Sequence, residues 1–164
     1  MRIRDYARED AAALADLFGR SVRHFGPRAY DPAQVEAWAA GASAEGTAAR
    51  CGDGRTVLVA VDEEDRPLGY GDLEADGHLD HLYCAPEGEG RRVGSALYEE
   101  IERRALRQGL GRIHVEASEL ARPLFERRGF ALVTRNAVRI GSVVLHNYSM
   151  EKRLDGEDGG GSAG

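Results

Sequence analysis

The sequence predicts a mixed α/β fold, in which one central sheet carries helices on both faces. Apolar residues recur every three or four positions in some segments and form short alternating or continuous runs in others, which distinguishes helices from strands. Along the 164 residues these segments follow the order β-α-α-β-β-β-α-β-α-β-β. Three consecutive strands in the middle exclude a doubly wound Rossmann fold, because that fold alternates strands and helices strictly.

The amino-terminal third is predicted to hold one strand and two helices. Residues 2–6 form the strand, and residues 9–23 show the spacing of an amphipathic helix that ends at the Phe-Gly-Pro sequence 25–27. Asp31-Pro32 is typical of a helix start, since aspartate caps the first turn and proline fits its first position. The small, polar residues 41–54 are expected to form a loop.

Strands dominate the middle of the chain. Residues 56–61, 67–74 and 78–84 are predicted strands, and Ala75-Asp76-Gly77 is a hairpin turn between the last two. The remaining elements are a helix, a strand, a short helix and two strands, at 93–105, 113–117, 120–128, 131–139 and 143–151.

Length and composition narrow the class of protein. We expect one domain over residues 1–154 and a disordered tail over the acidic, Gly/Ser-rich residues 155–164. The chain has 28 acidic and 22 basic residues, and this net negative charge disfavours a nucleic-acid partner. No apolar run approaches the roughly 18 residues of a membrane helix, and because residues 1–5 are followed by a polar stretch we expect no signal peptide. Two cysteines without a CxxC motif fit a cytoplasmic protein with no structural metal.

A glycine- and arginine-containing turn between residues 84 and 93 is the most informative segment. A strand that runs through such a turn directly into a helix makes an anion site, because the first N–H groups of the helix are unpaired and its dipole is positive there. Gly90 and Gly94 allow close approach to a phosphate, and Arg91 and Arg92 can add charge-assisted bonds. It is not a Walker A loop. Taken alone, it could also be a plain strand-to-helix connection.

Two motifs in this half of the chain resemble those of the GNAT N-acetyltransferase superfamily. Residues 86–97 resemble motif A, Pro-x-x-Gln/Arg-x-x-Gly-x-Gly/Ala, and residues 121–130 resemble motif B, A-x-x-x-Y-x-x-x-G-F. The order of elements matches over nearly the whole chain. Motif B and the strand that ends at residues 147–152 resemble those of a bacterial subgroup whose substrates are mostly unassigned.

The resemblance implies acetyl-CoA as co-substrate, with its pyrophosphate on the backbone of motif A. The pantetheine arm is expected to pair with the preceding strand, where one N–H polarises the thioester carbonyl. Ser118 stands where many members have an asparagine that contacts CoA. The expected cofactor-binding residues are Leu82, Tyr83, Cys84, Glu89, Gly90, Arg91, Arg92, Val93, Gly94, Ser95, Ser118 and Phe125.

Three residues depart from the family pattern. Glu89 replaces a glutamine or arginine and brings a carboxylate near the phosphates, and Arg92 replaces the first glycine of the motif. Phe125 stands where many members have a tyrosine that protonates the leaving thiolate, so we expect it to pack beside the thioester instead. Cys84 is expected to be a small buried residue rather than a nucleophile, since direct transfer is the chemistry implied.

Proton transfer requires a base, because the attacking amine must be neutral. His81 titrates in the right range and is the first candidate; the alternative is a hydrogen-bonded structural histidine. Strand alternation places His81 and Tyr83 on the face opposite Leu82. Glu116 is a second candidate base and otherwise a surface carboxylate, and Tyr148 is a candidate acid with a structural alternative.

The acceptor is expected to be a primary amine of a small molecule or polypeptide. His24 and Tyr30 border the loop between the first two helices, which in this family covers the acceptor, and Glu74 and Asp80 are further candidate contacts. The acidic balance favours a cationic acceptor, and neither a nucleic acid nor a membrane is expected as partner. The sequence does not decide whether the protein forms a homodimer. The alternative function is a weak or inactive CoA-binding sensor module, which the departures at Glu89, Arg92 and Phe125 motivate.

Overall fold

The protein is described by a computed structural model over residues 1–154; the predicted disordered tail, 155–164, lies outside the described residues. The helices are α1 (Ala11–Phe25), α2 (Pro32–Ala39), α3 (Ala44–Cys51), α4 (Val93–Arg107) and α5 (Arg122–Arg127). The strands are β1 (Arg2–Asp5), β2 (Thr56–Val61), β3 (Pro67–Leu73), β4 (His78–Cys84), β5 (Arg112–Ala117), β6 (Ala131–Ile140) and β7 (Val143–Arg153). Short 3₁₀ turns lie at Arg8–Asp10, Gly26–Arg28 and Pro86–Gly88.

One mixed sheet organises these elements, as the sequence predicts. The described part of the chain forms a seven-stranded sheet in the order β1-β2-β3-β4-β5-β7-β6, in which only β4 and β5 run parallel. Helices flank both faces, because β2 is apolar on each of them: Leu58 and Ala60 pack in the cluster that contains α4, and Val59 and Val61 pack with α1. No helix within residues 1–154 is both long and apolar enough to cross a bilayer.

The predicted loop at 41–54 is wrong, since α3 occupies its centre. The Ser43 side chain caps this helix by accepting a hydrogen bond from the Gly46 N–H (3.0 Å), and α3 packs against α1. Its Arg50 pairs with Asp72, a fully buried carboxylate of β3 that also lies 3.4 Å from Arg55. A helix this short depends on tertiary packing rather than on its own propensity, and its small side chains give little periodic signal.

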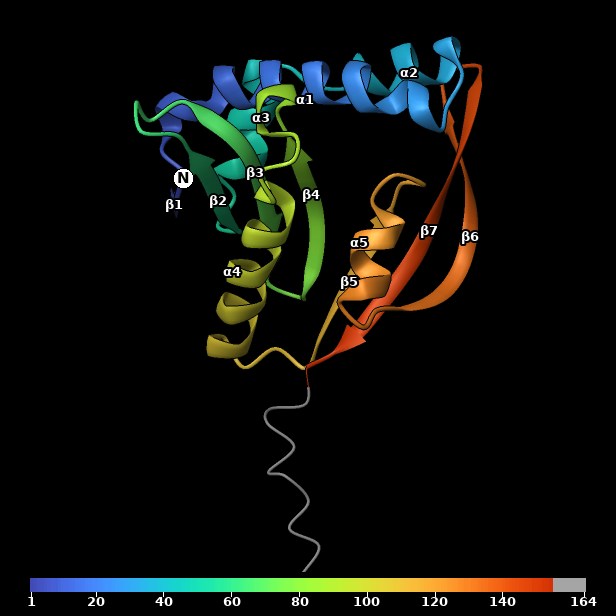
Figure 1. Ribbon diagram of the computed structural model, residues 1–164. Coiled ribbons are helices and arrows are strands. Elements are labelled where there is room, and N and C mark those ends of the chain that lie inside the picture. Colours follow the sequence, from blue (N-terminus) through green and yellow to red (C-terminus); the bar gives the residue numbers. More distant parts are fainter. Residues whose placement is uncertain (155–164) are drawn as a thin grey trace, which may run out of the picture.

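Strands β4 and β5 separate shortly after they begin. They pair only at His78–His114 and Leu79–Val115, and in Figure 1 the strands on either side of that point diverge like the arms of a V. A bulge in β4 accompanies the separation, since Gly71 pairs with Leu82 but Leu73 pairs with Leu79. Bulges bend a strand and re-aim its side chains. The predicted alternation is therefore interrupted: Leu79 and Leu82, three residues apart, pack in the same cluster.

Candidate active site

The turn before α4 is built as an anion-binding terminus. The first helical hydrogen bond runs from the Ala96 N–H to the Arg92 carbonyl, so the N–H groups of residues 93–95 precede it. Gly90 (φ +78°) and Arg92 (φ +58°) both adopt left-handed backbone conformations. Glycine takes this conformation at no steric cost, whereas another L-residue pays about 1 kcal/mol. The position of Arg92 is thus one that favours glycine, which is the residue found there in the motif it resembles.

The carboxylate of Glu89, in the turn before this terminus, is held by two basic groups. It accepts a hydrogen bond from Arg28 and lies 2.9 Å from the Nε2 of His24. Hydrogen bonds from His24 and Arg28 hold the pKa of Glu89 below its usual value. His24, an expected substrate contact, is therefore placed beside the cofactor turn and is not among the residues that line the cavities described next.

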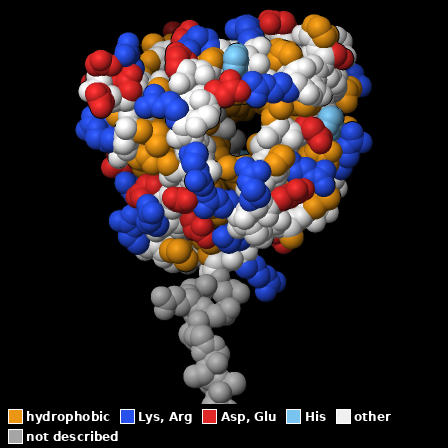
Figure 2. Space-filling model, viewed as in Figure 1, with side chains coloured by type: hydrophobic (Ala, Val, Ile, Leu, Met, Phe, Trp, Pro, Cys, Tyr) orange, Lys and Arg blue, Asp and Glu red, His pale blue; other side chains and the backbone are white. Residues whose placement is uncertain are grey.

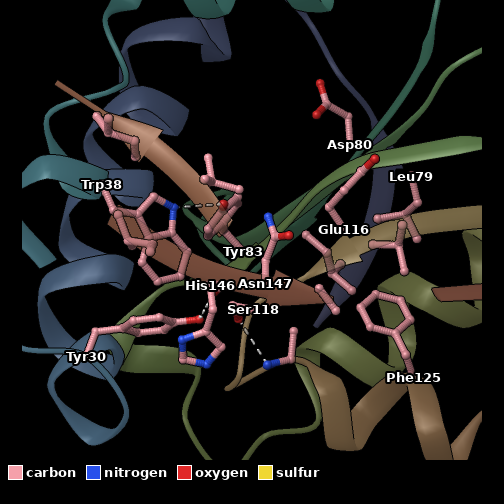
Figure 3. Close-up of a pocket in the computed structure, with 17 residues that line it drawn as sticks. Tyr30, Trp38, Leu79, Asp80, Tyr83, Glu116, Ser118, Phe125, His146 and Asn147 are labelled. Carbon is pink, nitrogen blue, oxygen red and sulfur yellow. Dashed lines mark hydrogen bonds between the residues drawn. The ribbon is translucent and has the colours of Figure 1, made fainter. Parts of the chain in front are cut away.

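Two cavities lie on either side of the gap between β4 and β5. The α1-side cavity is lined by residues of α1 and the end of β4, including Ser21, Phe25, Arg28 and Cys84. The β7-side cavity is lined by residues of β5, β7 and the start of β4, including Asp80, Glu116, His146 and Asn147 (Figure 3). Both share Trp38, Leu82, Tyr83, Ser118 and Ala121 as walls. Figure 2 shows the surface hollowed at the centre of this face, with basic side chains nearby.

Aromatic side chains form the boundary between the two cavities. The Trp38 indole N–H donates to the Tyr83 hydroxyl (3.3 Å), and the Trp38 ring lies 5.5 Å from that of Tyr30, edge to face. Burial raises the pKa of Tyr83 to about 12, so its phenol stays protonated at neutral pH. Tyr30, which the sequence predicts as a substrate contact, lines the β7-side cavity. Trp38 lines both cavities, and no sequence motif indicates this role.

The acidic residues of the site are each paired with a basic group. Asp80 and Glu116 line the β7-side cavity; Asp80 accepts from Arg55 at 2.9 Å, and Glu116 lies 2.5 Å from the Nε2 of His78. Glu74 lies 2.9 Å from the other nitrogen of His78 and outside both linings. Burial lowers the pKa of His78, but the hydrogen bonds to Glu116 and Glu74 outweigh it and raise the pKa above its usual value.

His81, the first candidate base, lines neither cavity. Its Nδ1 lies 3.0 Å from the Tyr70 hydroxyl, and its ring stacks on Phe18 at 5.6 Å. Burial lowers the pKa of His81 to about 4. A histidine with so low a pKa is a weak base, and His81 is absent from both linings, so the geometry favours the structural alternative.

The remaining expected residues divide between the cavity walls and their supports. Phe125 is fully buried, packs edge to face against Phe130 at 5.0 Å and lines the β7-side cavity. Ser118 lines both cavities and accepts from the Ala121 N–H (3.1 Å). Tyr148 lies behind the wall, where its hydroxyl donates to Glu119. Burial raises the pKa of Cys84 to about 11, which keeps its thiol protonated.

Sequence reasoning missed Glu119 and His146. His146 lines the β7-side cavity, and Glu119 follows Ser118 immediately after β5. They lie 27 positions apart and neither belongs to a motif, so only the pairing of β5 with β7 brings them together.

The chain is similar to known proteins in both sequence and structure. Residues 27–154 match the family model described as an acetyltransferase (GNAT) domain. YafP of Escherichia coli (strain K12), described as an uncharacterized N-acetyltransferase, is 27% identical over 150 residues, which cover 92% of this chain and 94% of the relative.

Solved structures agree with that match. A GCN5-related N-acetyltransferase from Rhodopseudomonas palustris, also described as an aminotransferase of class II, is 35% identical with a TM-score of 0.87, over 93% of this chain and 95% of the other. The PaiA N-acetyltransferase of Thermoplasma acidophilum, in complex with coenzyme A, is 20% identical with a TM-score of 0.77, over 93% and 98%. At 20% identity, this similarity is evidence for a shared fold and for nothing more specific.

Proposed function

Because the chain belongs to the acetyltransferase (GNAT) family and is an acyltransferase, we propose that it moves the acetyl group of acetyl-CoA directly to a primary amine. The observation that carries this proposal is the gap between β4 and β5, whose two sides open into cavities that share five wall residues. One ligand can enter from the α1 side and another from the β7 side. Their reacting groups would then meet beside Leu82 and Tyr83.

The residues around the α1-side cavity fit acetyl-CoA. The N–H groups at the start of α4 precede its first helical hydrogen bond, and together with the exposed side chains of Arg91 and Arg92 they suit a pyrophosphate. Beyond Leu79, the edge of β4 that faces β5 has no strand partner among the described residues, so it can pair with an extended amide chain. When bound, acetyl-CoA supplies an activated acetyl thioester. A relative of the same fold is described in complex with coenzyme A.

Direct transfer, without an acyl-enzyme, is supported by the state of Cys84. Its thiol stays protonated because burial raises its pKa to about 11, and the thiolate is the nucleophilic form. Phe125 brings no hydroxyl to the site. A thiol with a pKa of about 8.5 leaves readily as the thiolate, so the protein needs no strong acid at that position.

The lining of the β7-side cavity favours an amine carried by an apolar or aromatic body. Tyr30, Trp38 and Tyr83 form its aromatic wall, and the carboxylates of Asp80 and Glu116 are already paired with Arg55 and His78. Little unpaired negative charge is left for a second cationic group. We therefore propose a small molecule such as an arylalkylamine before a polyamine or a lysine side chain. Two free cysteines fit the cytoplasm as its place of action.

The test combines binding with turnover. Calorimetry with acetyl-CoA should give one site per chain, and release of free thiol should depend on the amine, faster with benzylamine or phenethylamine than with spermidine. Tight binding without thiol release for any amine would favour the CoA-binding sensor module. Absence of acetyl-CoA binding would overturn both functions.

A further inference from the structure

A hydrogen-bonded chain of three side chains ends on the wall of the β7-side cavity. The Tyr148 hydroxyl donates to Oε2 of Glu119 at 2.7 Å, and the same oxygen lies 2.6 Å from Nε2 of His146. His146 belongs to β7 and lines the cavity, whereas Tyr148 is buried behind it. A carboxylate that orients a cavity-lining imidazole is an arrangement that can move protons.

The charge of Glu119 fixes which imidazole nitrogen carries the proton. Hydrogen bonds from Tyr148 and from His146 hold the pKa of Glu119 below its usual value, so it is a carboxylate at neutral pH and can only accept. His146 must then donate through Nε2. In the neutral ring this leaves the lone pair on Nδ1, for which no residue in 1–154 provides a hydrogen bond.

Tyr30 fixes the backbone of Glu119 and the backbone of His146 relative to each other. Its hydroxyl accepts from the Glu119 backbone N–H at 2.9 Å and donates to the His146 carbonyl at 3.1 Å. Tyr30 is buried, and its ring lies 5.4 Å from that of His146. The carboxylate and the imidazole are thus fixed relative to each other by two contacts besides their own hydrogen bond, which is the support that a precise site needs.

Other titratable groups in the cavity are less suited to accept a proton. Of the five histidines, all within the described residues, only His146 lines either cavity. Asp80 and Glu116 are each engaged with a basic group at 2.9 Å and 2.5 Å. Two charged side chains lie next to the Tyr148–Glu119–His146 network. Arg122 stacks 4.3 Å over the Tyr148 ring, and Arg135 lines an adjoining cavity together with His146.

We propose that His146 is the catalytic base of the transfer and that Glu119 and Tyr148 are its positioning residues, an inference that rests on the proposed acetyl transfer to an amine. The amine nitrogen forms a bond to the acetyl carbon while the carbon–sulfur bond breaks and its electron pair leaves with sulfur. The proton lost by the nitrogen goes to Nδ1 of His146. The thiolate takes a proton from solvent and the imidazolium of His146 gives its proton back to solvent, so charge and atoms balance over the cycle.

The experiment compares His146→Asn with His114→Asn, using phenethylamine and acetyl-CoA as the substrates. Asparagine keeps a polar side chain but cannot take a proton near neutral pH. We expect His146→Asn to lower kcat about 10²- to 10⁴-fold, the usual contribution of a general base. Its acetyl-CoA affinity and melting temperature should stay within narrow limits of the wild type. His114, which stacks on His78 outside both cavities, should tolerate the same change with kcat within about twofold.

Two further readouts separate a base from a structural residue. In the wild type, log kcat should rise with slope one at low pH and then level off, and this limb should vanish in His146→Asn. Nitrogen NMR of the ¹⁵N-labelled protein should show the proton of neutral His146 on Nε2, and Glu119→Gln should weaken that preference.

Three outcomes would overturn the inference: an unchanged pH limb in His146→Asn, a loss of kcat below threefold, or a wild-type His146 protonated on Nδ1. Absence of turnover by the wild type with every amine, while acetyl-CoA still binds, refutes the proposed function itself. If the wild type turns over and His146→Asn retains that turnover, only the role of His146 as the base is refuted, and the proposed acetyl transfer stands.

Discussion

Replacing Gly94 by aspartate tests the cofactor turn without disturbing the fold. Gly94 is the second residue of α4, and a Cβ built there meets only the Cys84 sulfur, at 3.5 Å, which is an ordinary van der Waals contact. An acidic residue in the first turn of a helix is favoured by about 0.3–1 kcal/mol through the helix dipole. The variant should therefore be as stable as the wild type while it carries a new negative charge at the proposed phosphate site.

The size of the effect follows from the charge and its position. A carboxylate about 6 Å from one phosphate charge repels it by about 2.8 kcal/mol at an effective dielectric constant of about 20. Screening over a Debye length of about 8 Å roughly halves this where solvent has access. The expected loss of 1.3–2.8 kcal/mol is about a 10- to 100-fold rise in the Kd of acetyl-CoA.

Titration calorimetry with acetyl-CoA measures this loss, and a thermal melt of each protein checks the fold. Gly94→Ala is the matched control, because it fills the same space without charge and should bind within about threefold of the wild type. An unchanged Kd in Gly94→Asp would refute the assignment of the phosphates to this turn. Equal losses in both variants would show that space, and not charge, is limiting.

Two further predictions concern stability. Asp72→Ala removes the ion-pair partner that Arg50 has within residues 1–154, whereas Arg55 keeps Asp53 and Asp80, and it should cost about 3–5 kcal/mol in urea unfolding; a loss below 1 kcal/mol would contradict a buried ion pair. His78 has a raised pKa between Glu116 and Glu74, so its contribution to stability is complete below about pH 6.5 and is lost as the pH rises through its folded-state pKa. NMR titration should show that Glu116→Gln lowers this pKa; an unchanged value would contradict the pairing.

Elements with a local signal were predictable from the sequence. The start of α2 is one, since the Asp31 side chain accepts from the Gln34 N–H (2.8 Å), as the Asp-Pro pair predicts. The turn before α4 is another, because the N–H groups and glycines that define it are neighbours in sequence. Helix α3 was missed because its stability comes from α1 and from the pair between Arg50 and Asp72, neither of which leaves a periodic pattern.

The catalytic side of the site was less predictable, because long-range pairing positions it. The prediction for His81 assumed regular alternation along β4, and the Tyr70 hydroxyl and Phe18 ring that enclose it come from other elements. Glu119 and His146 meet because β5 and β7 pair with Ala117 opposite Tyr148. A register shift of one residue would turn His146 to the other face of the sheet, and no single segment encodes that register.

The overall charge of the chain is a poor guide to its cofactor site. The chain carries an excess of six acidic residues, yet the proposed ligand is a polyanion. The carboxylates nearest the turn are neutralised: Glu89 is paired with Arg28 and His24, and Glu87 with Arg20 at 2.7 Å. By contrast, the two exposed arginines that directly precede α4 have no ion pair within residues 1–154. The unpaired charge at the turn is therefore positive, and it adds to the helix dipole. Glu89, which departs from the family pattern, is compatible with phosphate binding because α1 and the turn that follows it supply its partners.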